Sequence, residues 1–347
     1  MKTIVFFETK PYDKASFEKV NARQYGFKIR YLDVKLTHET AVFARGADAV
    51  CVFVNSRVDV SAAEELEKIG IKLIALRCAG FNNIDLKSLY GKIRVVRVPA
   101  YSPYAIAEHA TALLLCMTRF IHKAYNRVRE GNFLLNGLTG RDLHGKTAGI
   151  VGTGKIGKIT ASILKGFGMK LLVYDKFPDP AWAESIGAEY TSFERLCAQS
   201  DALSLHSPLT PETRHMINEK TLGLMKEDAV LINTGRGALI DTKALVKALK
   251  HKKIGGAGLD VYEEEENYFF EDRSGEALED DILARLLTFP NVLITGHQAF
   301  LTEEALGAIA ETTLENIRQF FDLFDLLKDR QSGRLENEIC WEGDTSA

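Results

Sequence analysis

Short apolar runs alternate with polar, amphipathic stretches through the first third of the chain. This pattern is typical of strands that are covered by helices on both faces. It predicts helices over residues 16–23 and 61–68. It predicts strands over residues 3–7, 29–32, 49–54, 72–76 and 95–98. A parallel α/β sheet is therefore expected in this part of the chain.

A second alternation begins at residue 146. Before it, residues 104–129 contain neither Gly nor Pro and predict one long helix, and residues 132–144 read as a polar, Gly-rich connector. Six further strands are predicted over residues 146–151, 170–174, 202–205, 229–233, 256–260 and 292–295. Six strands with intervening helices are what a dinucleotide-binding domain requires.

The end of the chain changes character. Residues 302–327 predict a last helix, whereas residues 331–347 are polar, acidic and aperiodic. We expect residues 331–347 to form a flexible tail, or to face a partner through Cys340 and Trp341.

Composition narrows the class of protein. The formal net charge of −3 gives no general attraction to nucleic acid or to an anionic membrane. The five cysteines are scattered and form no C-x-x-C pair, so neither a disulfide framework nor a metal site is expected. The N-terminal apolar run is too short for a signal peptide, and no run reaches the roughly 18–20 residues of a membrane span. These features predict a cytoplasmic protein.

A glycine motif follows the first strand of the second alternation. Gly152, Gly154 and Gly157 form G-x-G-x-x-G between a strand and a helix. The first glycine permits a tight turn, the second lets the backbone approach a pyrophosphate, and the third lets the helix pack on the strand. The next strand ends in Asp175, where a carboxylate favours NAD over NADP because it repels a 2′-phosphate. The motif predicts a bound NAD.

Polar residues also follow three later strands. Most of the eight histidines read as surface or core residues, but His297, Arg236 and Asp260 each come directly after a strand. Ligands of open α/β sheets bind at that edge. Arginine suits a substrate carboxylate, and histidine suits proton donation to a developing alkoxide. A neighbouring carboxylate should orient the histidine, and spacing leaves this role open among Asp260, Glu263, Glu264, Glu265 and Glu266.

Six motifs carry a resemblance to a known family. They span residues 98–103 with 107–110, 151–157, 206–208, 233–237, 258–263 and 295–300. Together they resemble the D-isomer-specific 2-hydroxyacid dehydrogenases, and within them the fermentative D-lactate dehydrogenases. The resemblance extends to about residue 330.

The resemblance implies a role for each site residue. The catalytic set would be Arg236, Glu265 and His297. The cofactor residues would be the three glycines with Lys155 and Ile156, then Asp175, Ser207, Pro208, Thr234, Gly235 and Asp260, the last facing the nicotinamide carboxamide. The substrate would be held by Arg236, by backbone N–H groups of Ala79 and Gly80, by the Tyr101 hydroxyl, and by Phe300 as a wall.

The resemblance also implies a fold and an activity. The fold would be two doubly wound parallel-sheet α/β domains: a smaller flavodoxin-like substrate domain over residues 1–100 plus 300–330, and a Rossmann NAD-binding domain over residues 101–299. The activity would be reduction of pyruvate to D-lactate by NADH. Two alternatives stay open: reduction of another 2-keto acid (phenylpyruvate, 2-ketoisocaproate, glyoxylate or hydroxypyruvate), and an NAD-sensing, corepressor-like binding protein.

A homo-oligomer, either dimer or tetramer, is also implied. The apolar face of residues 104–129, carried by Ala107, Ala110, Leu114 and Met117, would pack between the NAD-binding domains of two subunits. A core helix within one chain is the other interpretation of that face.

Overall fold

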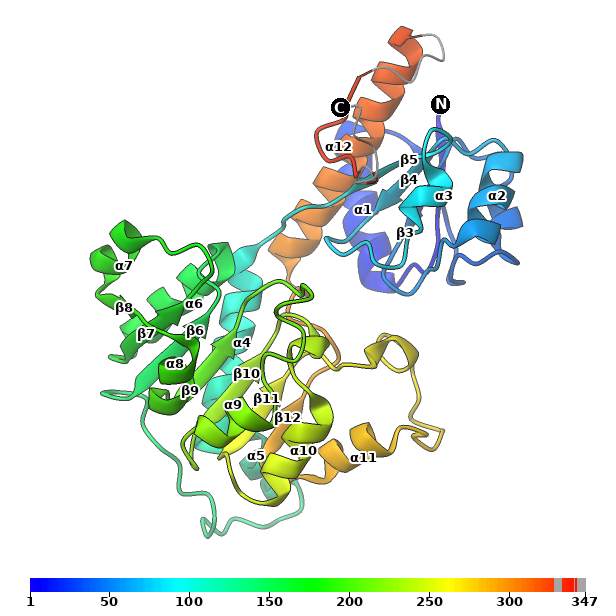
Figure 1. Ribbon diagram of the computed structural model, residues 1–347. Coiled ribbons are helices and arrows are strands. Elements are labelled where there is room, and N and C mark those ends of the chain that lie inside the picture. Colours follow the sequence, from blue (N-terminus) through cyan, green and yellow to red (C-terminus); the bar gives the residue numbers. More distant parts are fainter. Residues whose placement is uncertain (328–332, 340, 342–347) are drawn as a thin grey trace. The chain divides into compact units, whose positions relative to one another are not determined.

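The computed structural model describes residues 1–327, 333–339 and 341 (Figure 1). The chain divides into two compact units. Unit 1 comprises Met1–Ser102 with Leu301–Ala347, and unit 2 comprises Pro103–Phe300. Each unit is described by itself.

Unit 1 is built on a parallel five-stranded sheet whose strand order, β2-β1-β3-β4-β5, is that of flavodoxin-like folds. Every strand predicted for this region is found, and the aliphatic runs of the central strands β1, β3 and β4 are buried almost throughout. The strands are β1 (Thr3–Phe6), β2 (Lys28–Tyr31), β3 (Ala49–Val52), β4 (Leu73–Leu76) and β5 (Arg94–Arg97). The helices are α1 (Pro11–Gln24), α2 (Val60–Lys68), α3 (Leu86–Leu89), the 3₁₀ helix η1 (Ala41–Ala44) and α12 (Glu303–Leu327), and α12 packs on α1, β4 and β5.

The segment after α12 differs from the expected flexible tail. Residues 333–339 lie along β5, where Val96 and Glu338 form an antiparallel bridge and Leu335 is buried. The Trp341 ring lies 6.0 Å from that of Tyr90, centroid to centroid. Cys340 lies outside the described residues. The prediction of a tail was therefore wrong for residues 333–339, because the edge of β5 offers unpaired backbone groups that sequence periodicity does not reveal.

Unit 2 is built on a parallel seven-stranded sheet of order β12-β11-β10-β9-β6-β7-β8, which is the Rossmann order with one further strand beyond the sixth. Six strands match the prediction, and the three-residue β8 was missed. The strands are β6 (Thr147–Val151), β7 (Lys170–Tyr174), β8 (Ala188–Tyr190), β9 (Ala202–Leu205), β10 (Val230–Asn233), β11 (Gly256–Leu259) and β12 (Val292–Ile294). The helices are α4 (Pro103–Arg119), α5 (Ile121–Arg129), α6 (Lys155–Gly166), α7 (Pro180–Ile186), α8 (Phe193–Gln199), α9 (Glu219–Leu224), α10 (Thr242–Lys250) and α11 (Asp281–Thr288), with the 3₁₀ helices η2 (Gly237–Leu239) and η3 (Glu265–Asn267).

The predicted helix over residues 104–129 is two helices. Phe120 adopts left-handed backbone angles (φ 53°) between α4 and α5. The last turn of α4 finds partners outside the helix: the Thr118 carbonyl accepts from the Arg141 amide, and the Cys116 carbonyl contacts Nδ1 of His122. These contacts replace the bonds that would have continued the helix.

The apolar face of α4 is core of a single chain. Ala110, Leu114 and Met117 are buried with Ile150 and Ala161 of the same unit. The expectation that this face packs between subunits was therefore wrong, and the core-helix interpretation holds. Exposed apolar side chains lie further on instead, at Tyr125 and Val128 of α5 and at Phe133, Leu134 and Leu135.

The described residues contain neither a membrane span nor a metal-ligand cluster. No helix there is both long and apolar enough to cross a membrane. No group of three or more metal-ligating side chains is found in the same part of the chain.

Candidate active site

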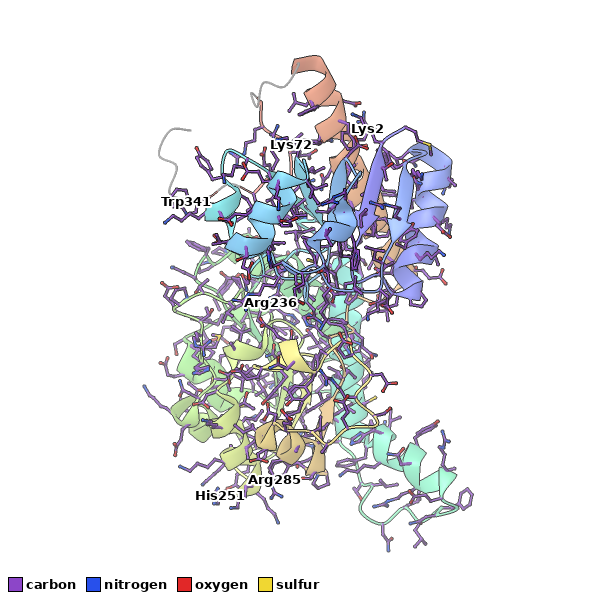
Figure 2. All side chains as sticks on the ribbon, turned by 90° about the vertical axis from the view of Figure 1, so that its right-hand side faces the viewer. Lys2, Lys72, Arg236, His251, Arg285 and Trp341 are labelled. Atoms are coloured by element: carbon purple, nitrogen blue, oxygen red, sulfur yellow. The ribbon has the colours of Figure 1, made fainter. Side chains whose placement is uncertain are left out.

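The candidate site lies at one edge of the unit 2 sheet. All its strands are parallel, so their carboxyl ends share that edge. The predicted residues follow β6 (Gly152), β7 (Asp175), β10 (Arg236), β11 (Asp260) and β12 (His297). Within unit 2, Arg236 is at one end and His251 and Arg285 at the other (Figure 2). The sequence-predicted groups are thus brought to one side of unit 2.

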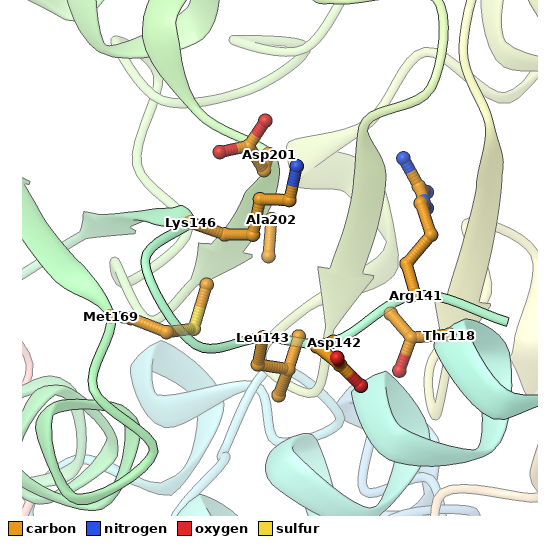
Figure 3. A pocket seen from close by; sticks show the side chains of 8 residues that line it. All are labelled: Thr118, Arg141, Asp142, Leu143, Lys146, Met169, Asp201 and Ala202. Carbon is orange, nitrogen blue, oxygen red and sulfur yellow. The ribbon is translucent and has the colours of Figure 1, made fainter.

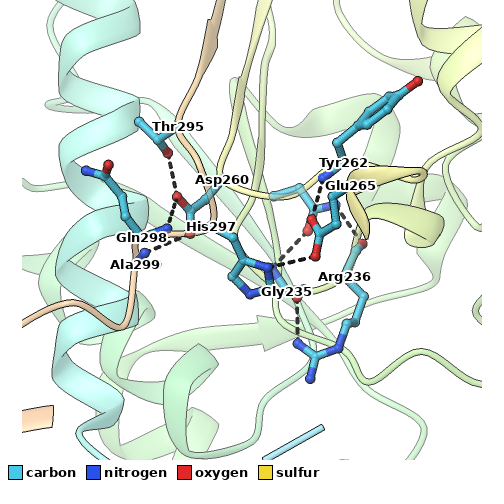
Figure 4. Close-up of polar contacts among 10 residues, drawn as sticks. Gly235, Arg236, Asp260, Tyr262, Glu265, Thr295, His297, Gln298 and Ala299 are labelled. Atoms are coloured by element: carbon cyan, nitrogen blue, oxygen red, sulfur yellow. Dashed lines mark hydrogen bonds and ion pairs between the residues drawn. The ribbon is translucent and has the colours of Figure 1, made fainter. Parts of the chain in front are cut away.

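One contact at this edge joins His297 to Glu265. His297 Nδ1 lies 2.7 Å from Glu265 Oε1 (Figure 4), and each side chain is about one-fifth exposed (22% and 21%). The other oxygen, Oε2, accepts from the Tyr262 amide at 2.9 Å. The carboxylate is therefore fixed at both oxygens, and the imidazole keeps Nε2 for other partners.

This contact separates Glu265 from the other acids that spacing left open. Glu263 turns away to His215 (Oε1 to Nε2, 2.5 Å) and to the Thr242 hydroxyl (3.0 Å). Glu264 and Glu266 are exposed. The geometry therefore pairs His297 with Glu265.

Asp260 is fully buried and its carboxylate accepts from several donors at once. Oδ1 accepts from the Thr295 hydroxyl (2.5 Å) and the Gln298 amide (2.9 Å), and Oδ2 accepts from the Ala299 amide (2.8 Å). His109 Nε2 lies 3.3 Å from Oδ1. Burial alone would raise the pKa of Asp260, but the hydrogen bonds from His109, Thr295 and the two amides outweigh it, so the pKa is lowered.

These contacts hold the turn that carries the histidine. His297 lies in the left-handed region (φ 55°), which costs a side-chain-bearing residue about 1–3 kcal/mol. Asp260 accepts hydrogen bonds from both sides of that position: from the Thr295 hydroxyl before it, and from the backbone amides of Gln298 and Ala299 after it. The observed role of Asp260 is thus to order the turn, and its predicted contact with a cofactor stays a prediction.

Arg236 is presented by a short loop after β10. The Asn233 side chain bridges this loop, donating to the Arg236 carbonyl (2.9 Å) and accepting from the Gly235 amide (3.0 Å). A Cβ on Gly237 would stand 2.1 Å from the Tyr262 backbone, so only glycine lets this loop lie against the one that carries Glu265. One guanidinium donor, Nη1, reaches the Gly235 carbonyl (2.8 Å).

The glycine loop takes the conformation its motif predicts. Gly152 has φ +91°, and a Cβ there would stand 2.7 Å from the backbone of His206 and Ser207. A Cβ on Gly157 would stand 1.9 Å from the Gly152 carbonyl oxygen. A Cβ on Gly154, the N-cap of α6, would meet nothing within 4 Å. The loop is therefore tight on the protein side and open at Gly154.

Asp175 reaches back to this loop. Its Oδ2 accepts from the Thr153 amide (2.6 Å) and hydroxyl (3.1 Å), and its Oδ1 accepts from the Phe177 amide (2.8 Å). The carboxylate expected to meet a ribose is thus fixed beside the glycine turn by a threonine that the sequence did not single out.

Other predicted cofactor residues surround the same edge. Lys155 and Ile156 form the first turn of α6, and Ser207 and Pro208 follow β9 beside the glycine loop. The Thr234 hydroxyl is buried and has no hydrogen-bond partner among the described residues. Burial lowers the pKa of the neighbouring His206 to about 4, so this histidine is neutral and is no rival proton donor.

The predicted substrate residues lie in both units. Ala79 and Gly80 are in the loop that follows β4 of unit 1, and Tyr101 follows β5. Phe300 is the buried last residue of unit 2. Their roles stay predictions.

Besides Thr153, three supporting residues were not predicted from the sequence. Asn233, Thr295 and His109 hold the loops but do not stand out by spacing. His109 belongs to the motif over residues 107–110, yet it was passed over with most histidines. Its Nε2 lies 3.1 Å from the Thr295 hydroxyl, a contact between α4 and the end of β12 that only the fold creates.

A small pocket lies at the opposite edge of the unit 2 sheet, before the strands begin (Figure 3). It is lined by Thr118, Arg141, Asp142, Leu143, Lys146, Met169, Asp201 and Ala202. Arg141 pairs there with Asp228, and Lys226 with Asp201. None of the predicted site residues reaches it.

Known proteins resemble the chain over most of its length. The family model described as D-isomer specific 2-hydroxyacid dehydrogenase, NAD binding domain, matches residues 111–299. D-lactate dehydrogenase of Escherichia coli strain K12 is 50% identical over 315 residues, which cover 90% of this chain and 95% of that protein. The 2-hydroxyacid dehydrogenase homolog 1 of Schizosaccharomyces pombe is 52% identical over 319 residues, or 91% and 96% of the two chains. The structure of the pyruvate reductase of Chlamydomonas reinhardtii superposes with a TM-score of 0.89 at 43% identity, covering 96% of this chain and 98% of that one.

Proposed function

This chain belongs to the D-isomer-specific 2-hydroxyacid dehydrogenase family, an NAD-binding family of oxidoreductases, and on that premise we propose that it reduces pyruvate to D-lactate with NADH. One observation carries the proposal: Glu265 and His297 are hydrogen-bonded at the sheet edge that also carries Arg236. The names of the relatives from Escherichia coli and Chlamydomonas reinhardtii support pyruvate as the first substrate to test.

The residues at the edge fit a dinucleotide. The open position at Gly154, at the N-terminus of α6, would hold the pyrophosphate through backbone N–H groups. Asp175 would hold the adenosine ribose. The unpaired Thr234 hydroxyl and the backbone of Ser207, Pro208 and Gly235 would line the rest. Hydride donation to the keto carbon is the chemistry that the bound cofactor supplies.

His297 is the proposed proton donor. Because Nδ1 is held by Glu265, Nε2 is the atom that can deliver a proton to the keto oxygen. The negative charge of Glu265 stabilises the protonated ring before transfer. The fixed turn over residues 295–299 keeps the ring from turning away.

Arg236 is the proposed anchor of the substrate carboxylate. Its planar guanidinium has five donors, and the contact to the Gly235 carbonyl uses one nitrogen. A bidentate grip on a carboxylate would orient the keto group for attack. The roles of Ala79, Gly80, Tyr101 and Phe300, and the assignment of unit 1 as the substrate domain and unit 2 as the NAD-binding domain, belong to the same proposal.

We also propose a cytoplasmic homo-oligomer. The exposed apolar residues Tyr125, Val128, Phe133, Leu134 and Leu135 favour a surface that is covered by another copy. The four described cysteines carry thiols rather than disulfides, as a reducing compartment favours.

The test is NADH oxidation with pyruvate, 2-ketobutyrate, phenylpyruvate, hydroxypyruvate and glyoxylate in parallel, followed by chiral analysis of the product. Fastest turnover of pyruvate to D-lactate supports the proposal. Preference for a bulkier or smaller acid would keep the chemistry and overturn the substrate. Failure with all five acids, with NADH still bound, would favour an NAD-binding regulator.

A further inference from the structure

The loop Arg77–Asn83 of unit 1 is fixed at both ends. Arg77, which is 1% exposed, donates to the Phe7 carbonyl (3.0 Å) and the Glu8 carbonyl (2.7 Å). Asn83 Nδ2 donates to the carbonyls of Phe53 (3.0 Å) and Ser56 (2.6 Å). These bonds do not reach residues 79–81, in the middle of the loop.

Arg97, the last residue of β5, holds that middle. Its Nη1 donates to the Ala79 carbonyl at 2.7 Å, and its guanidinium lies 5.1 Å from the centroid of the Phe81 ring. A hydrogen bond from a charged donor is roughly twice as strong as a neutral one. The ring contact adds a second hold on the same loop.

The position of this bond has a consequence for Gly80. The Ala79 carbonyl and the Gly80 N–H belong to one planar trans peptide and point in opposite directions. Because Arg97 holds the carbonyl, it also fixes the direction of the Gly80 N–H. A cation on the carbonyl polarises the peptide and makes that N–H a stronger donor. Among the described residues, the amides of Ala79 and Gly80 donate to no other group.

Arg97 is in turn held by the C-terminal segment, defined as residues 333–339. The Arg97 amide donates to the Asn337 carbonyl (3.1 Å), and Asn316 of α12 donates to the Arg97 carbonyl (2.9 Å). Asn337 Nδ2 donates to Asn316 Oδ1 (2.8 Å), which closes a ring of three residues.

An ion pair binds the same segment to β5 at Arg94, three residues before Arg97. Arg94 pairs with Glu338 through Nε (2.7 Å) and through Nη2, and both side chains are 13% exposed. The Ile339 amide donates to the Val95 carbonyl (2.9 Å). The backbone of the C-terminal segment thus bonds to Val95 and Arg97, which are alternating residues of β5. From Arg97 the side chain extends to the loop.

We propose that Arg97 is a positioning residue for the anion-binding amide of Gly80, and that the C-terminal segment keeps Arg97 in place. The inference rests on the proposed function, since it takes the loop to bind the carboxylate of a 2-keto acid. It gives that segment a role in substrate affinity, although it lies outside the predicted catalytic machinery.

The first test compares Arg97→Met with Lys72→Met, which removes an exposed positive charge elsewhere in unit 1. For Arg97→Met we expect KM for pyruvate to rise roughly 10- to 100-fold, the range for losing a charged hydrogen bond. We expect kcat at saturation and NADH affinity to stay near wild type. Arg97→Lys should recover part of the loss, because an ammonium can reach the carbonyl but lacks the planar fork.

The second test does not depend on turnover. The backbone amide resonance of Gly80 should shift in Arg97→Met, because its peptide loses the cation on the Ala79 carbonyl, and should stay in place in Lys72→Met. This readout separates the two claims: a wild type that reduces no keto acid would sink the proposed function, whereas an unmoved Gly80 amide resonance in Arg97→Met would sink the positioning role.

The third test addresses the C-terminal segment. Glu338→Gln, and a chain ending at residue 332, should both raise KM and should move the Gly80 amide resonance in the same direction as Arg97→Met. Adding Arg97→Met to either should raise KM no further than Arg97→Met alone, because the effects share one route. If the two changes raise KM by factors that multiply, the C-terminal segment does not act through Arg97, and this part of the proposal is wrong. If the shortened chain does not fold, Glu338→Gln decides.

Discussion

The glycine loop and the catalytic edge of unit 2 lie at the same side of one sheet, yet they are built differently. The glycine loop, residues 152–157, owes its shape to missing Cβ atoms within six consecutive residues. The catalytic edge gathers Arg236, Glu265 and His297 on three separate loops. A hydrogen bond joins His297 to Glu265, the Tyr262 amide holds Glu265, and the Gly235 carbonyl holds Arg236. The glycine loop is therefore shaped by close backbone packing, and the catalytic edge by hydrogen bonds of polar and charged side chains.

The two regions should therefore tolerate different kinds of substitution. A steric device fails when volume is added and is indifferent to pH. A hydrogen-bonded device keeps its shape under some substitutions but loses its chemistry when a charge is removed.

The largest effect is expected at His297. Asparagine tolerates the left-handed backbone found there, so His297→Asn should fold. Loss of the proton donor should lower kcat by about 10²- to 10⁴-fold. NADH affinity, measured by fluorescence titration, should not change, since the glycine loop is untouched. Turnover close to wild type would remove His297 from the mechanism.

The next effect is expected at Glu265. Glu265→Gln keeps the shape but removes the charge that stabilises the protonated ring, so kcat/KM should fall roughly 10- to 100-fold. Glu264→Gln, one residue away and exposed, is the matched control and should leave kcat/KM unchanged. A comparable loss in Glu264→Gln instead would reassign the role.

A smaller effect is expected in the glycine loop, and it should split in two. Gly157→Ala puts a Cβ 1.9 Å from a backbone oxygen and should destabilise the protein by about 1–3 kcal/mol in denaturant unfolding. Gly154→Ala has open space and should keep wild-type stability within about 1 kcal/mol while it weakens NADH binding. Equal stability losses in both variants would contradict the assignment of Gly157 to helix packing and of Gly154 to cofactor binding.

The same contrast explains what the sequence could reveal. The glycine loop and Asp175 could be predicted because their residues lie close together in the sequence. The need for small residues at the turn is visible in the glycine spacing itself. The strands could be predicted because buried parallel strands are continuous apolar runs, except β8, whose three residues, Ala188–Tyr190, are too short for a pattern.

Long-range contacts could not be predicted. Spacing left five acids beside His297, and only the fold turns Glu263 to His215 and Glu265 to the histidine. The break at Phe120 depends on Arg141 reaching the end of α4. The docking of residues 333–339 depends on the free edge of β5. Each of these is decided by a partner distant in sequence, which periodicity does not encode.

The most direct test of the central claim is a double-mutant cycle on kcat/KM for pyruvate, with Glu265→Gln, His297→Asn and both together. If Glu265 acts through the histidine, the double variant should be no slower than His297→Asn alone. If the second substitution slows the reaction by the same factor in both backgrounds, the two residues act independently, and the account of a Glu265–His297 proton donor is wrong.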